Sequence, residues 1–249
     1  MQHPYELVLW HGWGMHPAVW NGLAAQLTAQ HGITPQKPAL PGYAGTAAPV
    51  TTTLDTLVDT MLADIAQPVT LCGWSLGALL ALHAAQRHPD KVARLILIGA
   101  TPSFVQRADW RHGMTPQALE EFTEAVDIDP KTALKRFIAH FNQNDANGRN
   151  IGRTLNQALS RDALPPTAIF ATGLALLRDT DLRSLLPGIA QPTLLLHGAH
   201  DPLMPLAAAE WLAATLPQAR LEVLPDAAHA AFLSDPARCA ALMADFIHA

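Results

Sequence analysis

A serine lies between two glycines in the segment Gly73-Trp74-Ser75-Leu76-Gly77, which follows a short apolar run and precedes an alanine-rich one. When a strand turns sharply into a helix around a serine, the hydroxyl stands out from the sheet edge, and the glycines let the two backbones pass closely. A serine hydroxyl becomes an effective nucleophile only when a base removes its proton. The pattern therefore predicts that Ser75 is a catalytic nucleophile, with a histidine and a carboxylate as partners elsewhere in the chain.

Candidates for the base and the acid follow later in the sequence. Asp201 lies just after an apolar run at 193–197, and His229 lies in the loop after another run at 221–224. The order Ser, Asp, His at the carboxyl ends of successive strands is that of the α/β-hydrolase arrangement. We therefore expect His229 to be the general base and Asp201 to orient it.

Other residues compete for these two roles. His200 is next to Asp201, and Asp226 and Asp235 are close in sequence to His229. Asp235 directly precedes a proline, which is typical of a helix cap. A capping or loop role explains both of these aspartates better than an orienting role, and His200 is the weaker candidate for the base.

Acyl transfer also needs two N–H groups that stabilise the negative charge of the transition state. Leu76, the residue after the nucleophile, is expected to provide one from the start of its helix, and Trp13 is expected to provide the other from the turn after an apolar run at 6–10. The side chains of Trp13 and Trp74 would form apolar walls beside the attacked carbon. A serine nucleophile argues against dehalogenase and epoxide-hydrolase chemistry, so cleavage of esters, thioesters, amides or carbon–carbon acyl bonds remains.

The elements that must position these residues alternate between apolar runs and helical patterns, as in a mostly parallel sheet with helices on both faces. Residues 104–184 differ because they contain no strand signal and several helix starts, among them Thr115-Pro116 and Asp129-Pro130. We predict an α/β core of residues 1–103 and 185–249 with a helical lid at 104–184. Strands are expected at 6–10, 33–37, 69–72, 95–98, 193–197 and 221–224, and core helices at 19–30, 53–67, 206–215 and 236–248.

Composition limits the class of protein. A chain of 249 residues with 49% apolar and 15% charged residues is typical of one compact α/β domain. The net charge of -5 argues against nucleic-acid binding by the whole surface, and no apolar run approaches the roughly 20 residues of a membrane span. No secretory signal is visible, so a cytoplasmic protein is expected. Cys72 and Cys239 have no metal-type spacing, and no metal or cofactor is expected.

Charge is unevenly distributed within the predicted lid. Between Asp129 and Asp162 the only acid is Asp145. Two pairs of cations in this stretch are spaced i,i+4, so each pair lies on one face of its helix, and such a patch on an acidic protein favours an acidic partner. The alternative is an ordinary solvated helix face. The basic residues of the stretch are Lys131, Lys135, Arg136, Arg149, Arg153 and Arg161.

Together, the segments 9–15, 73–77 and 88–92, the Asp201 and His229 loops, and the lid segments 135–139 and 179–183 resemble the pimeloyl-[acyl-carrier protein] methyl ester esterases of biotin biosynthesis. The resemblance covers nearly the whole chain. It implies a serine carboxylesterase that hydrolyses the methyl ester of pimeloyl-acyl-carrier protein and releases methanol. It also implies a triad of Ser75, Asp201 and His229, with Trp13 and Leu76 as oxyanion donors.

The resemblance further implies that lid arginines contact the carrier protein that bears the acyl substrate. On this sequence those contacts fall on Arg136, Arg149 and Arg153, while Phe137 would line the acyl path. A further arginine of the family corresponds to Thr132 here, where a neighbouring lysine could compensate. The N-terminus also lacks the usual leading hairpin, which would shorten the sheet by one edge strand.

Three alternatives remain open at this stage. Two are enzymes of the same fold, a general short-chain carboxylesterase and a carbon–carbon bond hydrolase. The third is a small-molecule receptor that keeps the pocket but performs no catalysis. The expected molecule is a monomer that binds neither nucleic acid nor a membrane.

Overall fold

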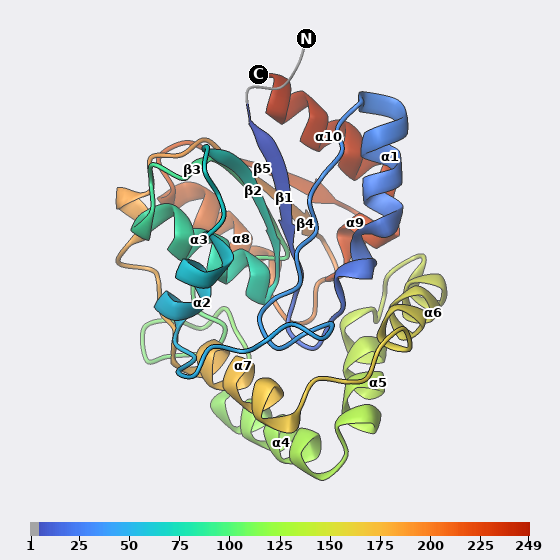
Figure 1. Cartoon of the computed structure of the whole chain (residues 1–249). Coiled ribbons are helices and arrows are strands. Elements are labelled where there is room, and N and C mark those ends of the chain that lie inside the picture. The colour runs from blue at the N-terminus through green and yellow to red at the C-terminus, as the bar shows by residue number, and fades with distance from the viewer. Residues whose placement is uncertain (1–4) are drawn as a thin grey trace.

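The computed structural model describes residues 5–249, in which five strands form one sheet in the order β1-β2-β3-β4-β5 (Figure 1). Every pair of neighbouring strands is parallel. Strands β2 and β4, which lie on either side of the central strand β3, are buried along their whole length, which explains why their sequences are mostly apolar. The strands are β1 (Glu6–Trp10), β2 (Val69–Trp74), β3 (Val92–Ile98), β4 (Thr193–Gly198) and β5 (Ala219–Leu224).

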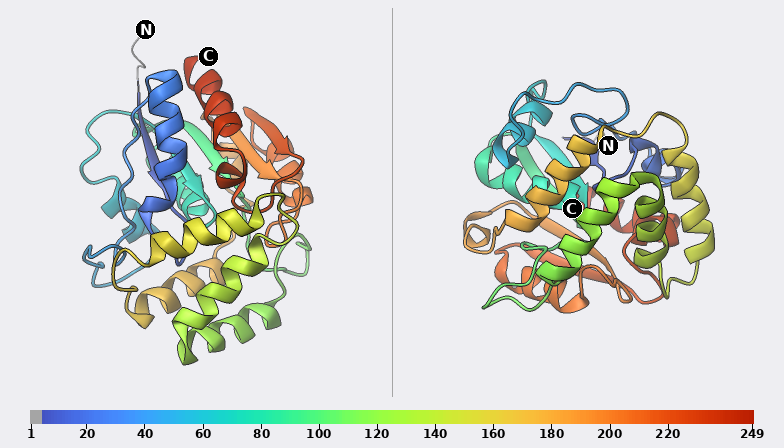
Figure 2. Two further views of the ribbon diagram at one scale, coloured as in Figure 1. Left: turned by 90° about the vertical axis from the view of Figure 1, so that its right-hand side faces the viewer. Right: turned by 90° about the horizontal axis from the view of Figure 1, so that it is seen from below.

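Helices cover both faces of the sheet (Figures 1 and 2). Helices α1 and α10 pack against each other on one face, and α3 packs on the other face beside α2 and α8. This is the layered α/β architecture that the alternating pattern predicts. The core helices are α1 (Asn21–His31), α2 (Leu54–Met61), α3 (Leu76–Arg87), α8 (Leu206–Thr215), α9 (Ala231–Ser234) and α10 (Pro236–His248), with short 3-10 turns η1 (Pro17–Trp20) and η2 (Leu186–Gly188).

Four helices are inserted between β3 and β4, and we call them the four-helix insertion. They are α4 (Pro116–Ile128), α5 (Pro130–Phe141), α6 (Gly148–Leu159) and α7 (Thr167–Asp179). Thr115 and Asp129 cap α4 and α5 in front of a first-turn proline, as their sequences predict. Seen from below, the insertion lies across the carboxyl ends of the strands, which is where the candidate site is (Figure 2).

The strand predicted at 33–37 is wrong. Only Gln36 pairs with β1, through bonds of 2.8 Å from Leu9 N to Gln36 O and from Gln36 N to Leu7 O. Pro35 and Pro38 lie on either side of this bridge, and a proline cannot donate a hydrogen bond to a strand ladder. The segment therefore makes one contact with the sheet and leaves it.

The helix predicted at 53–67 is correct only in its first part, because α2 ends at Met61. Its last turn tightens into i,i+3 bonds, from Ala63 N to Thr60 O and from Ile65 N to Leu62 O. Lys91 Nζ also donates a hydrogen bond of 2.8 Å to the main-chain oxygen of Leu62. The main-chain oxygen of Leu62 thus bonds to Lys91 and to a tight turn, and the helix ends earlier than its apolar spacing predicts.

The N-terminal prediction, a missing hairpin, concerns a segment whose residues 1–4 lie outside the described part of the chain. Between residues 5 and 249 no helix has the length and apolar character needed to cross a membrane. Cys72 and Cys239 are both free and buried.

Candidate active site

Ser75 occupies a strained turn between the end of β2 and the start of α3. Its φ of 58° and ψ of -118° lie outside the regions that a non-glycine residue normally adopts. A Cβ on Gly73 would overlap the main-chain oxygen of Gly77, and a Cβ on Gly77 would overlap that of Trp10. Both glycines are therefore required for the close passage of strand and helix, and the structure places Ser75 at the turn that the sequence predicts.

His229 and Asp201 form a buried hydrogen-bonded pair at the same end of the sheet. The distance from His229 Nδ1 to Asp201 Oδ2 is 2.7 Å. The other carboxylate oxygen of Asp201 accepts the N–H groups of Leu203 and Met204, each at 2.9 Å. Burial alone would raise the pKa of Asp201, but the charge and hydrogen bond of His229, with smaller effects of His197 and the Met204 amide, hold that pKa below its ordinary value. An ionised Asp201 directs the Nδ1 proton of His229 to itself and leaves Nε2 to act as a base.

Trp74, the neighbour of Ser75, connects the serine turn to the histidine loop. Its indole Nε1 donates a hydrogen bond of 3.0 Å to the main-chain oxygen of His229, and its ring centroid lies 5.5 Å from that of the imidazole. Within residues 5–249 the Ser75 hydroxyl makes no direct hydrogen bond to His229. Such a bond is often long in an enzyme without substrate and tightens when substrate binds.

Two glycines that the sequence analysis did not single out make room for His229. Gly99, just after β3, has φ +52°, and a Cβ there would lie 3.0 Å from Nδ1 and Cε1 of the imidazole. A Cβ on Gly198, at the end of β4, would overlap the main-chain oxygen of Ala228. A glycine at the carboxyl end of a predicted strand is the signal that could have identified both positions.

The competing residues do not take part in the pair. His200 is exposed, Asp226 is exposed, and Asp235 caps α10 by accepting the Arg238 amide at 2.9 Å. His197 is buried 3.8 Å from Asp201 Oδ2 and donates its Nε2 proton to Met204 O at 2.8 Å. Burial lowers the pKa of His197. Because His197 donates its proton to Met204 O, the histidine that is hydrogen-bonded to Asp201 is His229.

The turn after β1 brings Trp13 to the nucleophile. A Cβ on Gly12 would lie 3.2 Å from the Cβ of Ser75, so the two segments touch. His11 holds this turn, because its Nε2 accepts the Leu40 amide at 3.0 Å and its Nδ1 donates to Gly12 O at 2.9 Å. Burial lowers the pKa of His11 to about 4, which keeps it neutral.

The two expected oxyanion donors have unused amide protons. In the described part of the chain, neither the Trp13 amide nor the Leu76 amide donates a hydrogen bond to another protein group. Leu76 is the first residue of α3, so its N–H also lies at the positive end of a helix. Both amides are therefore free to donate to a ligand oxygen, which is one requirement for an oxyanion donor.

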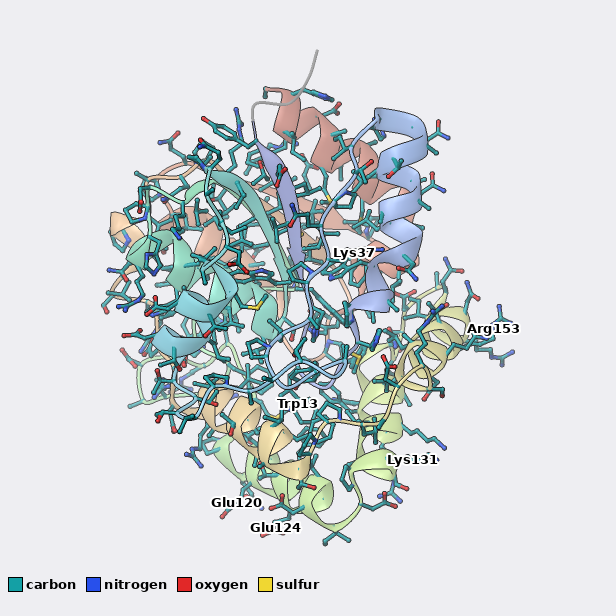
Figure 3. All side chains as sticks on the ribbon, viewed as in Figure 1. Trp13, Lys37, Glu120, Glu124, Lys131 and Arg153 are labelled. Atoms are coloured by element: carbon teal, nitrogen blue, oxygen red, sulfur yellow. The ribbon has the colours of Figure 1, made fainter. Side chains whose placement is uncertain are left out.

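An aromatic cluster from the insertion covers the serine turn, and Figure 3 shows Trp13 between the core and the insertion. The ring centroid of Trp13 lies 5.4 Å from that of Phe122 on α4, 5.6 Å from that of Phe137 on α5 and 5.4 Å from that of Phe170 on α7. Phe141 contacts both Phe137 and the His229 ring, at 5.0 and 5.4 Å. Ser75 is only 9% exposed beneath this cluster.

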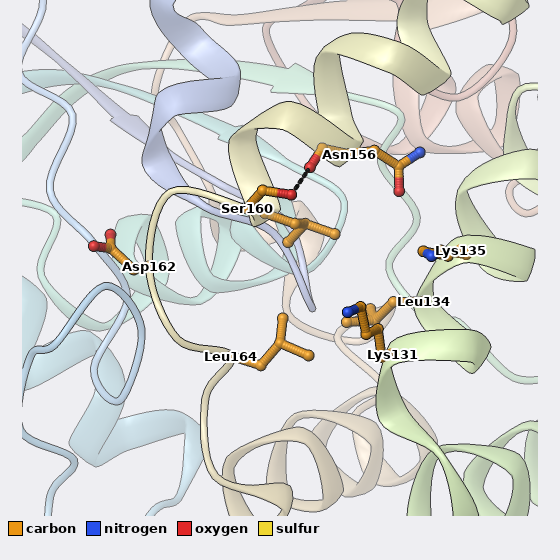
Figure 4. Close-up of a pocket in the computed structure, with 8 residues that line it drawn as sticks. Lys131, Leu134, Lys135, Asn156, Ser160, Asp162 and Leu164 are labelled. Atoms are coloured by element: carbon orange, nitrogen blue, oxygen red, sulfur yellow. Dashed lines mark hydrogen bonds between the residues drawn. The ribbon is translucent and has the colours of Figure 1, made fainter.

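A cavity of about 320 Å³ lies between α5, α6 and the loop after α6 (Figure 4). Lys131 and Lys135 line one side of it, and Asp162 lines the other. Asp162 is held by His16 of the core, whose Nε2 lies 2.7 Å from Asp162 Oδ2. The lining thus combines these charged side chains and the polar Asn156 and Ser160 with three apolar side chains, which are Leu134, Leu159 and Leu164.

The predicted carrier contacts lie outside this cavity. Arg136 on α5 and Arg149 and Arg153 on α6 are exposed, as is Thr132. Figure 3 shows Lys131 and Arg153 on one side of the insertion and the acidic Glu120 and Glu124 on α4. Residues 5–249 contain no group of three or more His, Cys, Asp or Glu side chains that could hold a metal ion.

Comparison with known proteins gives three kinds of match. Residues 6–236 match the family model described as the alpha/beta hydrolase fold. The chain is 45% identical over 247 residues to the pimeloyl-[acyl-carrier protein] methyl ester esterase of Aromatoleum aromaticum, covering 97% of this chain and 98% of that protein. It is 34% identical to the protein of the same name from Nitrosomonas europaea, covering 93% of this chain and 91% of that one.

Solved structures show the same fold at lower identity. An esterase from Exiguobacterium antarcticum superposes with a TM-score of 0.86 at 24% identity, covering 100% of this chain and 94% of that one. The enol-lactonase of Burkholderia xenovorans superposes with a TM-score of 0.81 at 20% identity, covering 100% and 93%. These likenesses concern the fold, whereas the sequence relatives define the family. The chain therefore belongs to the α/β-hydrolase fold family and, within it, to the pimeloyl-[acyl-carrier protein] methyl ester esterases.

Proposed function

We propose that this enzyme is a serine carboxylesterase that hydrolyses the methyl ester of pimeloyl-acyl-carrier protein and releases methanol in biotin synthesis. The hydrolytic part of the proposal depends above all on the 2.7 Å His229–Asp201 pair beside the strained turn at Ser75. The choice of substrate is supported by the names of the relatives, including the one at 45% identity.

In this mechanism the Ser75 hydroxyl attacks the ester carbonyl while His229 Nε2 takes its proton. The amides of Trp13 and Leu76 stabilise the negative oxygen of the tetrahedral intermediate. The intermediate collapses, the bond to the methoxy group breaks, and His229 returns the proton to the departing methanol. Water then attacks the acyl-enzyme with the same proton transfers and frees the carboxylic acid and Ser75.

The aromatic cluster provides an apolar, water-poor surface for the acyl chain. Phe137 packs between Trp13 and Phe141, so a chain that passes Phe137 reaches the rings that flank His229. Because Ser75 is 9% exposed, an ester reaches it only when the insertion or its side chains move aside. The insertion acts as a lid in this proposal.

The basic side of the insertion is the surface on which we place the carrier protein. Arg136, Arg149 and Arg153 are exposed there, and Lys131 and Lys135 stand at the cavity between α5 and α6. A carrier protein is acidic and bears a phosphodiester, so these cations would attract it and guide its acyl arm toward the cavity. The lysines would take the part of the family arginine that corresponds to Thr132.

Replacement of the nucleophile tests the proposal directly. Ser75→Ala should abolish methanol release from pimeloyl-acyl-carrier protein methyl ester, and it should fail to restore growth without biotin to a host that lacks its own esterase. Circular dichroism and thermal unfolding of the variant serve as controls for folding. Retained hydrolysis by a folded Ser75→Ala protein would refute the assignment.

Charge reversal tests the carrier surface. Arg149→Glu with Arg153→Glu should raise KM for the carrier-linked substrate while hydrolysis of nitrophenyl butyrate stays unchanged. Arg220→Glu, which changes an exposed arginine on β5 outside the insertion, is the matched control. Equal losses on both substrates, or no loss on either, would count against docking at this surface.

The proposal also includes a cytoplasmic, monomeric enzyme that needs no metal or cofactor. Cell fractionation and light scattering test the first two points, and full activity after treatment with a chelator tests the third.

A further inference from the structure

The turn between α5 and α6, residues 142–147, is fastened to the loop that carries His229. The carboxylate of Asp145 in this turn accepts hydrogen bonds from two residues that are far away in sequence. Its Oδ2 accepts the main-chain N–H of Ala228 at 2.7 Å, 83 positions away, and its Oδ1 accepts the Ser234 hydroxyl at 3.0 Å. A carboxylate that accepts an amide proton makes a stronger hydrogen bond than a neutral group does. The amide of Ala228, the residue directly before His229, is therefore held by a charged group from the insertion.

Asp145 is itself held in place. Its Oδ1 also accepts the amide of Asn147 at 2.8 Å, which closes a local turn, and Gly148 N donates to Asp145 O at 3.1 Å. The side chain of Asn147 donates to Ser234 O at 2.8 Å. Both carboxylate oxygens are thus occupied, and the side chain has little freedom to leave Ala228.

Two main-chain bonds join the same segments. Ala146 N donates to Asp226 O at 3.0 Å, and His229 N donates to Phe141 O at 3.3 Å. On the opposite side, Gly198 at the end of β4 lies against the main-chain oxygen of Ala228. The histidine loop is therefore clamped between the sheet and the α5–α6 turn.

We propose that Asp145 is a positioning residue for the general base, because it sets the backbone from which the His229 imidazole reaches Asp201 and Ser75. This inference rests on the proposed function, in which His229 is the base. Asp145 is the one acid in an otherwise basic stretch of the insertion. That isolation fits a role directed to the histidine loop, whereas the cations around it are exposed.

Asp145→Asn is the decisive variant. An amide presents only one acceptor oxygen, so it cannot satisfy Ala228, Ser234 and Asn147 together. We expect kcat for nitrophenyl butyrate to fall about tenfold to a hundredfold with KM changed less than about twofold, since small misplacements of catalytic groups cost this much. Turnover is expressed per active site, and the active sites are counted by complete labelling with a fluorophosphonate probe. A loss of folded protein then does not appear as a loss of turnover.

Asp129→Asn is the matched control, because Asp129 also accepts an amide proton in the insertion but caps α5 away from the histidine loop. The control should keep wild-type turnover per labelled site. If Asp145→Asn also keeps turnover within twofold of the wild type, the positioning role is wrong.

Amide hydrogen exchange on the wild-type protein covers the case in which Asp145→Asn does not fold. The Ala228 and His229 amides should exchange at least about tenfold more slowly than the amide of the exposed Asp226. Equal exchange at these positions would overturn the clamp. The variant Ser75→Ala separates failure of the proposed function from failure of this inference. Activity in Ser75→Ala would show that His229 is not the base, independently of the result for Asp145→Asn.

Discussion

The indole Nε1 of Trp13 donates a hydrogen bond of 2.9 Å to the main-chain oxygen of Phe170, which joins the turn after β1 to the first turns of α7. The same ring contacts Phe122 and Phe137, so one core side chain meets three helices of the insertion. A Cβ on Gly173 of α7 would overlap the indole, which shows how closely this helix packs on it. Trp13 therefore holds the insertion against the core near Ser75 through one hydrogen bond and several ring contacts.

Shortening this side chain should loosen the insertion. Trp13→Phe keeps an aromatic ring but loses the donor, and it should lower the free energy of unfolding by about 1 kcal/mol. Trp13→Ala also loses the contacts of a buried ring and should cost about 3–5 kcal/mol. Urea denaturation measures both values. A Trp13→Ala protein as stable as the wild type would show that the contact is not holding the insertion.

Removing the charge of Asp201 should disable the base without unfolding the site. The amide of Asp201→Asn would present a donor to His229 or turn it to the wrong tautomer, and in a comparable triad this change lowers kcat by about 10⁴. Steady-state kinetics on nitrophenyl butyrate measure the effect. Asp226→Asn, at an exposed neighbouring position, is the control and should leave kcat unchanged. A loss below tenfold in Asp201→Asn would contradict the role of the pair.

Gly99→Ala should reduce turnover, beyond the loss of stability that backbone strain causes. Gly99 and Gly32 both have positive φ, +52° and +68°, but a Cβ at Gly99 meets the His229 ring whereas a Cβ at Gly32 meets nothing within 4 Å. Either alanine variant should lose about 1 kcal/mol of stability to backbone strain. Only Gly99→Ala should also lose turnover, by about tenfold or more. Equal turnover in the two variants would show that the space beside His229 is not needed.

Stability should fall in mild acid because of His11. The pKa of His11 is about 4 in the folded chain against 6.5 for a free histidine, so the unfolded chain binds a proton first as the pH falls. The stabilising contribution of neutral His11 is complete above pH 6.5 and is lost as the pH falls toward 4, with about 2 kcal/mol lost by pH 5. The pKa of His197 is lowered as well and adds to the same trend.

Urea denaturation at pH 7 and pH 5 tests this linkage. The wild type should lose more free energy of unfolding between the two pH values than His11→Gln does, whatever the absolute stability of the variant. The same pH dependence in both proteins would mean that His11 does not titrate as its burial requires.

Local sequence determined much of the fold and the candidates for the site. The glycines around Ser75, the apolar runs of β2 and β4 and the capped prolines at 116 and 130 each act within a few residues, and the structure forms the corresponding elements there. The segment around Gln36 shows the limit of such patterns. A strand is predicted at 33–37, but the neighbouring prolines leave this segment only one bridge to β1.

Only the tertiary structure decided which distant residues support the histidine loop. Asp145 binds Ala228 across 83 positions, and Trp74 binds His229 across 155, so neither contact belongs to a local periodicity. A pattern along the chain reports which face of an element is apolar, because that follows from the repeat of the helix or strand. It does not report which loop meets which turn, because that depends on how the sheet and the insertion pack together. The sequence by itself therefore determined the candidate nucleophile and the elements around it, and packing decided what holds its partners in place.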